Sequence, residues 1–201
     1  MARVVVSLVT HNESRDAERL LPTLFAQTFR DFEVVAIDNR SEDGTRASLA
    51  AAQKLAPVPM EIVASRENLG FTGGHNVGIA RAAERGAEWV LVLNADVVLA
   101  PDYLERLLDD AARPGREWVG AMTGKVLRAE GPELLPTNVV DTVGIRMTRS
   151  GRHFDVGAGD PDTGRWDRPA EVFGVSGCVA LYRVAALHDV SGIVFGVLLA
   201  G

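Results

Sequence analysis

Four short runs of apolar residues recur at near-regular intervals in the first half of the chain. They span residues 4–9, 33–37, 61–64 and 89–93 and are rich in Val and Ile. The first and last runs are almost wholly apolar, which is typical of strands buried on both faces of a sheet. This pattern predicts four strands of a mainly parallel sheet.

Helical patterns separate these runs. They cover residues 15–27, 45–55 and 74–85, and a fourth helix is expected to begin at Pro101, because proline suits a first helical position. The first helix places its leucines on one stripe with charged residues opposite. Strands and helices that alternate in this way predict right-handed βαβ units in an α/β fold.

The pattern changes after Arg113, where Gly and Pro become frequent. Residues 149–169 are polar, Gly-rich and poorly periodic, so we expect a long surface loop there. Residues 172–182 then predict a strand and residues 184–189 a short helix.

We therefore expect residues 1–201 to form one domain. Its parts are a βα half at 1–113, a second half at 114–192 and an atypical apolar tail at 193–201.

Composition narrows the choice of partners. A net charge of -6 argues against nucleic acid, because binding to a phosphate backbone needs clustered Lys and Arg. Cys178 is the only cysteine, which favours a reducing compartment. No signal peptide is recognisable, and no apolar run reaches the roughly 20 residues of a bilayer span, so a cytoplasmic location is expected.

Polar clusters follow each predicted strand. They are Thr10-His11-Asn12-Glu13, residues 38–45, residues 68–78 and Asn94-Ala95-Asp96. Ligands of open parallel sheets bind where the carboxyl ends of the strands meet the N-termini of the helices. Four clusters at one edge of a sheet therefore predict a binding site.

Each cluster also has a simpler interpretation. Asp38-Asn39 and Asp43-Gly44 are ordinary turn and cap residues, and the glycines at 70–78 would permit a tight bend. Asn94-Ala95-Asp96 is either a strand-ending turn or a metal site. His11 and His75 are interpreted as hydrogen-bonding loop residues, because no Cys or His lies at ligand spacing from them.

Together the clusters resemble glycosyltransferase family 2, and within it the rhamnosyltransferase-like branch. The resemblance runs from Val4 to Gly192, and its most specific parts are residues 38–45, residues 68–78 and Asn94-Ala95-Asp96. It implies a GT-A fold, which is a three-layer α/β/α sandwich, and a nucleotide-diphosphate sugar donor.

The resemblance also implies roles for individual residues. Base and ribose would be held by Thr10, Asn12 and Asp38, and the rest of the donor would lie along Asn68, Gly74 and Asn76. Asp96, assisted by Asn94, would bind a Mg²⁺ or Mn²⁺ ion that bridges the two phosphates. A carboxylate suits either ion, which then takes further oxygens from the phosphates.

The family's catalytic base is the clearest departure. An inverting transfer needs a carboxylate that accepts the proton of the acceptor hydroxyl. The family keeps this acid shortly after the segment that matches residues 187–192, whereas residues 193–201 contain no Asp, Glu or His. We therefore expect a chain truncated before its base, or a natural short variant, that binds donor better than it transfers sugar.

Two functions remain open at this point. The first is transfer of a sugar, with rhamnose as the candidate, to a glycan or glycolipid acceptor in polysaccharide biosynthesis. Such an acceptor would bring the chain near a membrane surface, and the apolar tail suggests a homo-oligomer. The alternative is a non-catalytic nucleotide-sugar-binding module. A dinucleotide-dependent oxidoreductase is disfavoured, because no Gly-rich turn follows the first strand.

Overall fold

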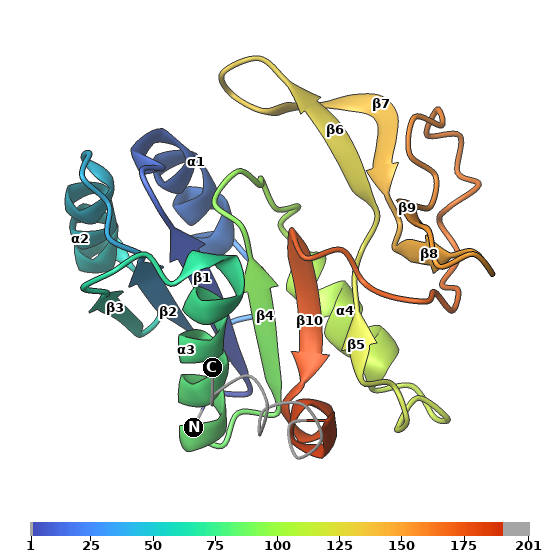
Figure 1. Cartoon of the computed structure of the whole chain (residues 1–201), viewed down its shortest axis with the longest axis horizontal. Coiled ribbons are helices and arrows are strands. Elements are labelled where there is room, and N and C mark those ends of the chain that lie inside the picture. Colours follow the sequence, from blue (N-terminus) through green and yellow to red (C-terminus); the bar gives the residue numbers. More distant parts are fainter. Residues whose placement is uncertain (1, 191–201) are drawn as a thin grey trace.

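The computed structural model describes residues 2–190, so the apolar tail expected at 193–201 lies outside the described residues. A six-stranded sheet in the order β3-β2-β1-β4-β10-β5 forms its centre (Figure 1). Four strands run parallel: β1 (Val4–Thr10), β2 (Phe32–Asp38), β3 (Met60–Ala64) and β4 (Trp89–Leu93). β10 (Val179–Arg183) is antiparallel to both of its neighbours, β4 and β5 (Ala121–Met122).

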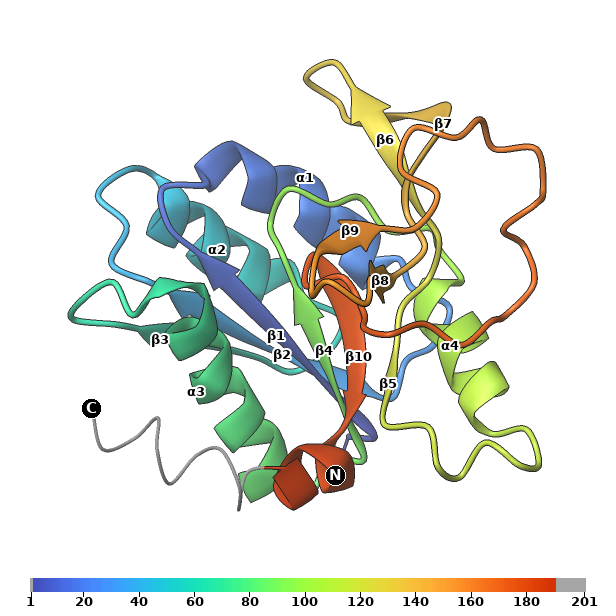
Figure 2. The ribbon, with the colours of Figure 1, turned by 45° about the vertical axis from the view of Figure 1, so that its right-hand side comes forward.

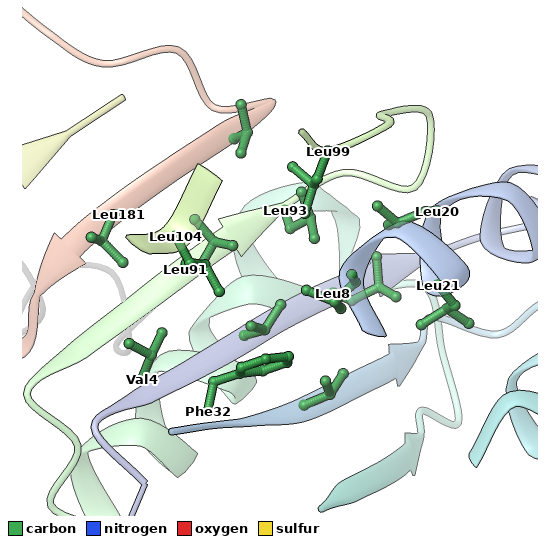
Figure 3. Close-up of a cluster of buried hydrophobic side chains, with 14 of the residues drawn as sticks. Val4, Leu8, Leu20, Leu21, Phe32, Leu91, Leu93, Leu99, Leu104 and Leu181 are labelled. Atoms are coloured by element: carbon green, nitrogen blue, oxygen red, sulfur yellow. The ribbon is translucent and has the colours of Figure 1, made fainter. Parts of the chain in front are cut away.

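Helices cover both faces of this sheet. α1 (Ser14–Phe25), α2 (Thr45–Leu55) and α4 (Tyr103–Ala111) contribute leucines to the larger core on one face, where Leu8 of β1 and Phe32 of β2 are buried (Figure 3). α3 (Gly70–Glu84) and a helical segment at residues 184–190 pack on the other face, over Val5 and Val35. The predicted three-layer α/β/α sandwich with a mainly parallel sheet is confirmed.

Beyond α4, two hairpins stand apart from the central sheet. One pairs β6 (Val126–Glu130) with β7 (Leu135–Thr142), and the other pairs β8 (Ile145–Met147) with β9 (His153–Asp155). Their residues are mostly exposed or half-buried, so they add little to the core.

Four sequence-based boundaries are corrected by the structure. α3 begins at Gly70 rather than at residue 74, and it tolerates glycines of low helix propensity in its interior, where Gly74 and Gly78 pack against β1. α4 begins at Tyr103, after a turn at Pro101. The loop expected at 149–169 contains β9, which pairs with β8, and the strand expected at 172–182 is confined to Val179–Arg183.

No helix within residues 2–190 combines the length and the apolar character that crossing a bilayer requires.

Candidate functional site

The register of the sheet brings the predicted polar clusters to one edge. Thr10 of β1 pairs with Asp38 of β2, which pairs with Ala64 of β3. Leu93, the last residue of β4, pairs with Val179, the first residue of β10. The segments that follow β1, β2, β3 and β4 therefore start side by side, as does the segment that enters β10.

A cavity of about 250 Å³ opens between these segments. Residues at or just after the carboxyl ends of β1, β2 and β4 line this cavity. The segment after β3 contributes Asn68, and α3 contributes its first two residues. The lining residues are Val9, His11, Glu13, Asn39, Asn68, Gly70, Phe71, Asn94 and Ala95. The expected convergence of the clusters is thus observed for Asn68 and Asn94.

Asn39 joins the segments after β2 and β3. Its side-chain amide donates to Asn68 Oδ1 at 2.9 Å and to the carbonyl oxygen of Gly70 at 3.2 Å, while its Oδ1 accepts the backbone N–H of Leu69 at 2.8 Å. The residue is only 2% exposed. A buried amide with three satisfied bonds fixes its neighbours firmly, because each lost bond would leave a buried polar group without a partner.

The segment after β1 is tied to the segment after β2 by Asn12. Its backbone N–H donates to Ser41 Oγ at 3.0 Å, and its Oδ1 accepts the backbone N–H of Glu42 at 2.8 Å. Its φ of 58° lies in the left-handed region, which asparagine tolerates better than most residues. Next to it, His11 Nδ1 lies 2.9 Å from the carbonyl oxygen of Asn39, in agreement with the predicted hydrogen-bonding role.

Thr10 and Asp38 lie beneath this surface. The Thr10 hydroxyl donates to the carbonyl oxygen of Ile37 at 3.3 Å and is fully buried. Asp38 accepts the backbone N–H of Ser41 at 3.0 Å and lies 3.9 Å from the guanidinium of Arg46. Neither side chain lines the cavity. In this conformation both side chains support the segments that follow β1 and β2 without lining the cavity themselves.

The two predicted site residues within α3 also lie away from the cavity lining. A Cβ on Gly74 would come within 2.8 Å of Val9 Cγ1, so the absence of a side chain lets α3 approach β1 closely. Asn76 is half-buried in the same helix. The simpler interpretation of the glycines at 70–78 is a tight bend, whereas Gly74 and Gly78 lie within α3 and let it pack closely against β1.

His75 belongs to α3 rather than to a loop, which corrects the expectation for it. Its Nδ1 lies 2.9 Å from Ser7 Oγ, and Phe71 contacts its ring edge-on. The imidazole is 3% exposed, and burial lowers its pKa to about 4. A neutral imidazole is therefore part of the folded structure near neutral pH.

The depressed pKa of His75 predicts acid sensitivity. Between pH 6.5 and about 4, the unfolded chain binds a proton at His75 that the folded chain does not, so the free energy of unfolding falls as pH falls, by about 3 kcal/mol over the window. Urea unfolding of the wild type and of His75→Gln at several pH values measures this. The variant should show a flatter curve, with His153→Gln, an exposed histidine, as control. Parallel curves in all three proteins would contradict the assignment.

Asp96 lies in a second cavity, which adjoins the first through the 94–96 segment. This cavity has a volume of about 330 Å³ and is lined by Asp96, Val97, residues of the β6–β7 hairpin, Asp141 and Cys178. The charge of Asp96 also raises the pKa of half-buried Glu13 in the first cavity, although burial is the larger cause. Glu13 therefore lines the first cavity, and Asp96 and Asp141 line the second, where Asp141 forms an ion pair with Arg128 at 3.5 Å.

This arrangement fits a divalent cation only in part. Within residues 2–190, no three His, Cys, Asp or Glu side chains are grouped as a ready-made metal site. Asp96 is exposed at the cavity mouth, where its carboxylate is free to coordinate. An ion bound there would need oxygens from a ligand, and Mg²⁺ commonly combines one or two carboxylates with substrate phosphates.

Three acids of the second half of the chain, Asp155, Asp160 and Asp189, lie away from both cavities. Asp189 lies in the helical segment that follows β10. Arg183, the last residue of β10, pairs with Trp89, the first residue of β4, so this helical segment begins at the edge of the sheet opposite the cavities. Asp160 accepts from Trp166 Nε1 at 3.3 Å, and Asp155 is exposed on β9. None of the three lines either cavity.

Sequence reasoning missed three of the residues that form the two cavities. Asn39 was grouped with the turn residues, Glu13 was noted only as part of a cluster, and Asp141 was not considered. For Asn39 a signal was present, because it belongs to the polar cluster that begins at Asp38, directly after the apolar residues of β2. Asp141 carries no such signal, since β7 has an irregular pattern.

Comparison with known proteins identifies the family. The model of Glycosyl transferase family 2 matches residues 5–190. An N-acetylglucosaminyl-diphospho-decaprenol L-rhamnosyltransferase of Mycobacterium tuberculosis is 32% identical over 140 residues, which are 66% of this chain and 43% of the relative. The succinoglycan biosynthesis protein ExoO of Rhizobium meliloti is 31% identical over 115 residues, 57% of this chain and 31% of the relative.

Solved structures agree on the fold. The mannosyltransferase PcManGT of Pyrobaculum calidifontis, in complex with GDP-Man and Mn²⁺, superposes with a TM-score of 0.62 at 22% identity and covers 94% of this chain and 46% of that chain. TarS 1-349 of S. aureus in complex with UDP gives 0.61 at 19% identity, covering 94% and 48%. The chain spans less than half the length of these relatives and structures. The predicted GT-A fold is confirmed, and the chain belongs to glycosyl transferase family 2.

Proposed function

We propose that this domain binds a nucleotide-diphosphate sugar at the carboxyl edge of its parallel strands. The observation that carries the proposal is the shared cavity at that edge, to which Asn39, Asn68 and Asn94 contribute from three separate segments. Open α/β sheets bind ligands at such an edge. A chain with a net charge of -6 has few cations to spare for phosphates, so backbone N–H groups and a metal ion supply the positive charge.

Asp96 holds the metal ion in this proposal, with Asn94 beside it. Asp96 would hold a Mg²⁺ or Mn²⁺ ion, which would supply Lewis-acid stabilisation of the negative charge on the leaving diphosphate. The structure of PcManGT with GDP-Man and Mn²⁺ supports this combination of ligands. Glu13 lies close enough to Asp96 to feel its charge, since burial and, to a smaller extent, the charge of Asp96 raise the pKa of the Glu13 carboxyl.

The reaction that we propose is an inverting transfer of the sugar to a glycan or glycolipid acceptor in polysaccharide biosynthesis. The similarity to a rhamnosyltransferase over 66% of the chain supports rhamnose as the sugar. We place the reaction in the cytoplasm, which the single cysteine favours.

Thermal unfolding in the presence of nucleotides tests the donor site. At 100 times its Kd, a nucleotide diphosphate stabilises the folded state by about 2.7 kcal/mol, which for a chain of this size raises Tm by about 5–10 °C. UDP, dTDP and GDP are compared, each with and without Mn²⁺. A rise in Tm that requires both nucleotide and Mn²⁺ is expected, and no rise with any nucleotide would refute the donor site.

A second candidate is donor binding without transfer. It is favoured by the positions of Asp155, Asp160 and Asp189, none of which lines a cavity, so no proton acceptor is placed by these three residues. Donor hydrolysis and sugar transfer, assayed under conditions where the Tm rise is complete, separate the two candidates. Robust turnover by this polypeptide would exclude the binding module.

A further inference from the structure

The β8–β9 hairpin concentrates positive charge in an acidic chain. Residues 143–154 contain three arginines, at 146, 149 and 152, and one histidine, and Asp155 at the end of β9 is the one acid of the hairpin, whereas the chain as a whole has a net charge of -6. All three arginines are exposed. We call residues 143–154 the basic hairpin.

None of these three arginines forms an ion pair with another residue of the described chain. Their basic neighbours are paired: Lys125 with Asp162 and Asp167, and Arg165 with Asp160. The basic hairpin is therefore a local excess of charge that the folded domain does not neutralise.

The turn of the basic hairpin is firmly built. Thr148 donates its backbone N–H to the carbonyl oxygen of Arg152 at 2.9 Å, and its hydroxyl lies 2.9 Å from Ser150 Oγ and accepts the backbone N–H of Arg152 at 3.1 Å. Gly151 adopts the positive φ of 78° that the turn requires. Arg149 and Arg152 are consequently presented at the tip on an ordered backbone.

Apolar side chains flank this charged tip. Met147 is 42% exposed, Phe154 is 48% exposed, and Phe173, whose ring contacts His153, is 60% exposed. In the register of the hairpin Arg146 lies opposite Phe154 on one face, and on the other Met147 lies opposite His153 and Ile145 opposite Asp155, so each face combines apolar and ionisable residues. The hairpin projects from the side of the domain towards the viewer in Figure 2.

We propose that the basic hairpin docks onto the surface of an anionic lipid bilayer. Guanidinium groups at the tip bind headgroup phosphates, while Phe154 and Met147 enter the interface between headgroups and acyl chains. An anionic bilayer offers phosphates to the basic side chains and an apolar layer to the apolar side chains. The phosphate backbone of a nucleic acid would bind only the arginines.

Docking in this orientation places the second cavity near the membrane. β7, which contributes Asp141 to that cavity, leads directly into β8, and Ile145 donates its backbone N–H to the carbonyl oxygen of Gly174 on the way to β10. A lipid-linked acceptor would then reach the cavity of Asp96 from the bilayer. This link to the acceptor rests on the proposed function, whereas the docking itself does not.

Vesicle co-sedimentation tests the docking. The 201-residue chain is mixed with vesicles of phosphatidylcholine alone or with about a third of phosphatidylglycerol, at low and at high salt. Binding is expected only with the anionic lipid and is weakened by salt. Each arginine near such a surface contributes about a fivefold factor, so the triple change Arg146→Gln, Arg149→Gln and Arg152→Gln should weaken binding about 100-fold.

A matched triple variant controls for net charge. Lys54→Gln, Arg106→Gln and Arg113→Gln remove the same charge from exposed positions on or directly after α2 and α4 and should leave binding unchanged. Phe154→Ser alone should weaken binding while salt sensitivity is kept. Equal loss in both triple variants, no binding of the wild type to anionic vesicles at low salt, or equal binding to a soluble polyanion would each overturn the proposal. The Tm rise with nucleotide needs no vesicles, so failure of docking and failure of the donor site are distinguished.

Discussion

In Asp96→Asn, the Mn²⁺-dependent part of nucleotide-diphosphate binding is expected to weaken by at least about 100-fold. Changes to the outer shell of a metal site alone cost about 10–100-fold in affinity, and Asp96 is the proposed direct ligand. An amide oxygen is a neutral and weaker donor than a carboxylate for a hard divalent cation. Without an ordered metal, no ion would offset the negative charge of Glu13, the carboxylate that lines the first cavity.

The measurement is the same thermal unfolding series, with Asp109→Asn as the matched control. Asp109 is an exposed acid on α4, away from both cavities, so its replacement removes one charge without touching the site. Without ligand, Asp96→Asn should unfold at the wild-type temperature or slightly above it. Asp96 is exposed, and its charge helps to raise the pKa of Glu13, so its removal relieves a repulsion between like charges.

Three results are distinguishable in this series. Loss of the metal-dependent Tm rise in Asp96→Asn alone supports the assignment. An unchanged rise in that variant would show that another group holds the ion. Equal loss in Asp109→Asn would point to net charge rather than to coordination.

The first half of the fold could be predicted because its strands are buried on both faces. A parallel strand between two helical layers, such as Trp89–Leu93, is almost purely apolar, and that signal needs no knowledge of the partner strands. Because these four strands are parallel, their carboxyl ends lie at one edge of the sheet, and the polar residues that follow them gather there. The sequence alone therefore predicts that positions 68, 94 and 96 lie at one edge of the sheet.

The second half could not be predicted in the same way. The β8–β9 hairpin is exposed on both faces, so its sequence lacks the alternation of apolar and polar residues that identifies a half-buried strand. The start of α3 was missed for a different reason. Gly70, Gly73 and Gly74 are poor helix formers, and of these three only Gly74 lies against β1, where it contacts Val9.

The contact between α3 and β1 also explains why the role of Gly74 could not be predicted from the sequence. A glycine near a donor site and a glycine required by helix packing have the same appearance in a sequence. The structure supplies the distance to Val9 that distinguishes them. Since Gly78 lies one turn further along α3, against Ser7 of the same strand, both glycines belong to one line of close approach.

Gly78→Ala is expected to destabilise the domain by about 3 kcal/mol, which lowers Tm by about 6–12 °C in a chain of this size. The new Cβ would lie 2.5 Å from Ser7 Cβ and 3.3 Å from Ser7 Cα, so α3 would have to move away from β1. Alanine favours a helix over glycine by only about 1 kcal/mol, which does not offset the overlap. Gly174→Ala is the control, because its Cβ would meet only Ile145 Cβ at 3.8 Å.

A double-mutant cycle with Ser7→Gly shows whether the overlap with Ser7 is the cause. Removing the Ser7 side chain costs stability in the wild type, because it leaves His75 Nδ1 without its partner and a gap against α3. In the presence of Gly78→Ala the same change makes room for the new methyl group, so the two effects should be coupled by more than about 1 kcal/mol. Strict additivity in urea unfolding would mean that the contact between α3 and β1 tolerates a side chain, and the close-approach role of Gly78 would be wrong. Because α3 begins at the first cavity, a displaced helix should also weaken nucleotide binding in Gly78→Ala but not in Gly174→Ala.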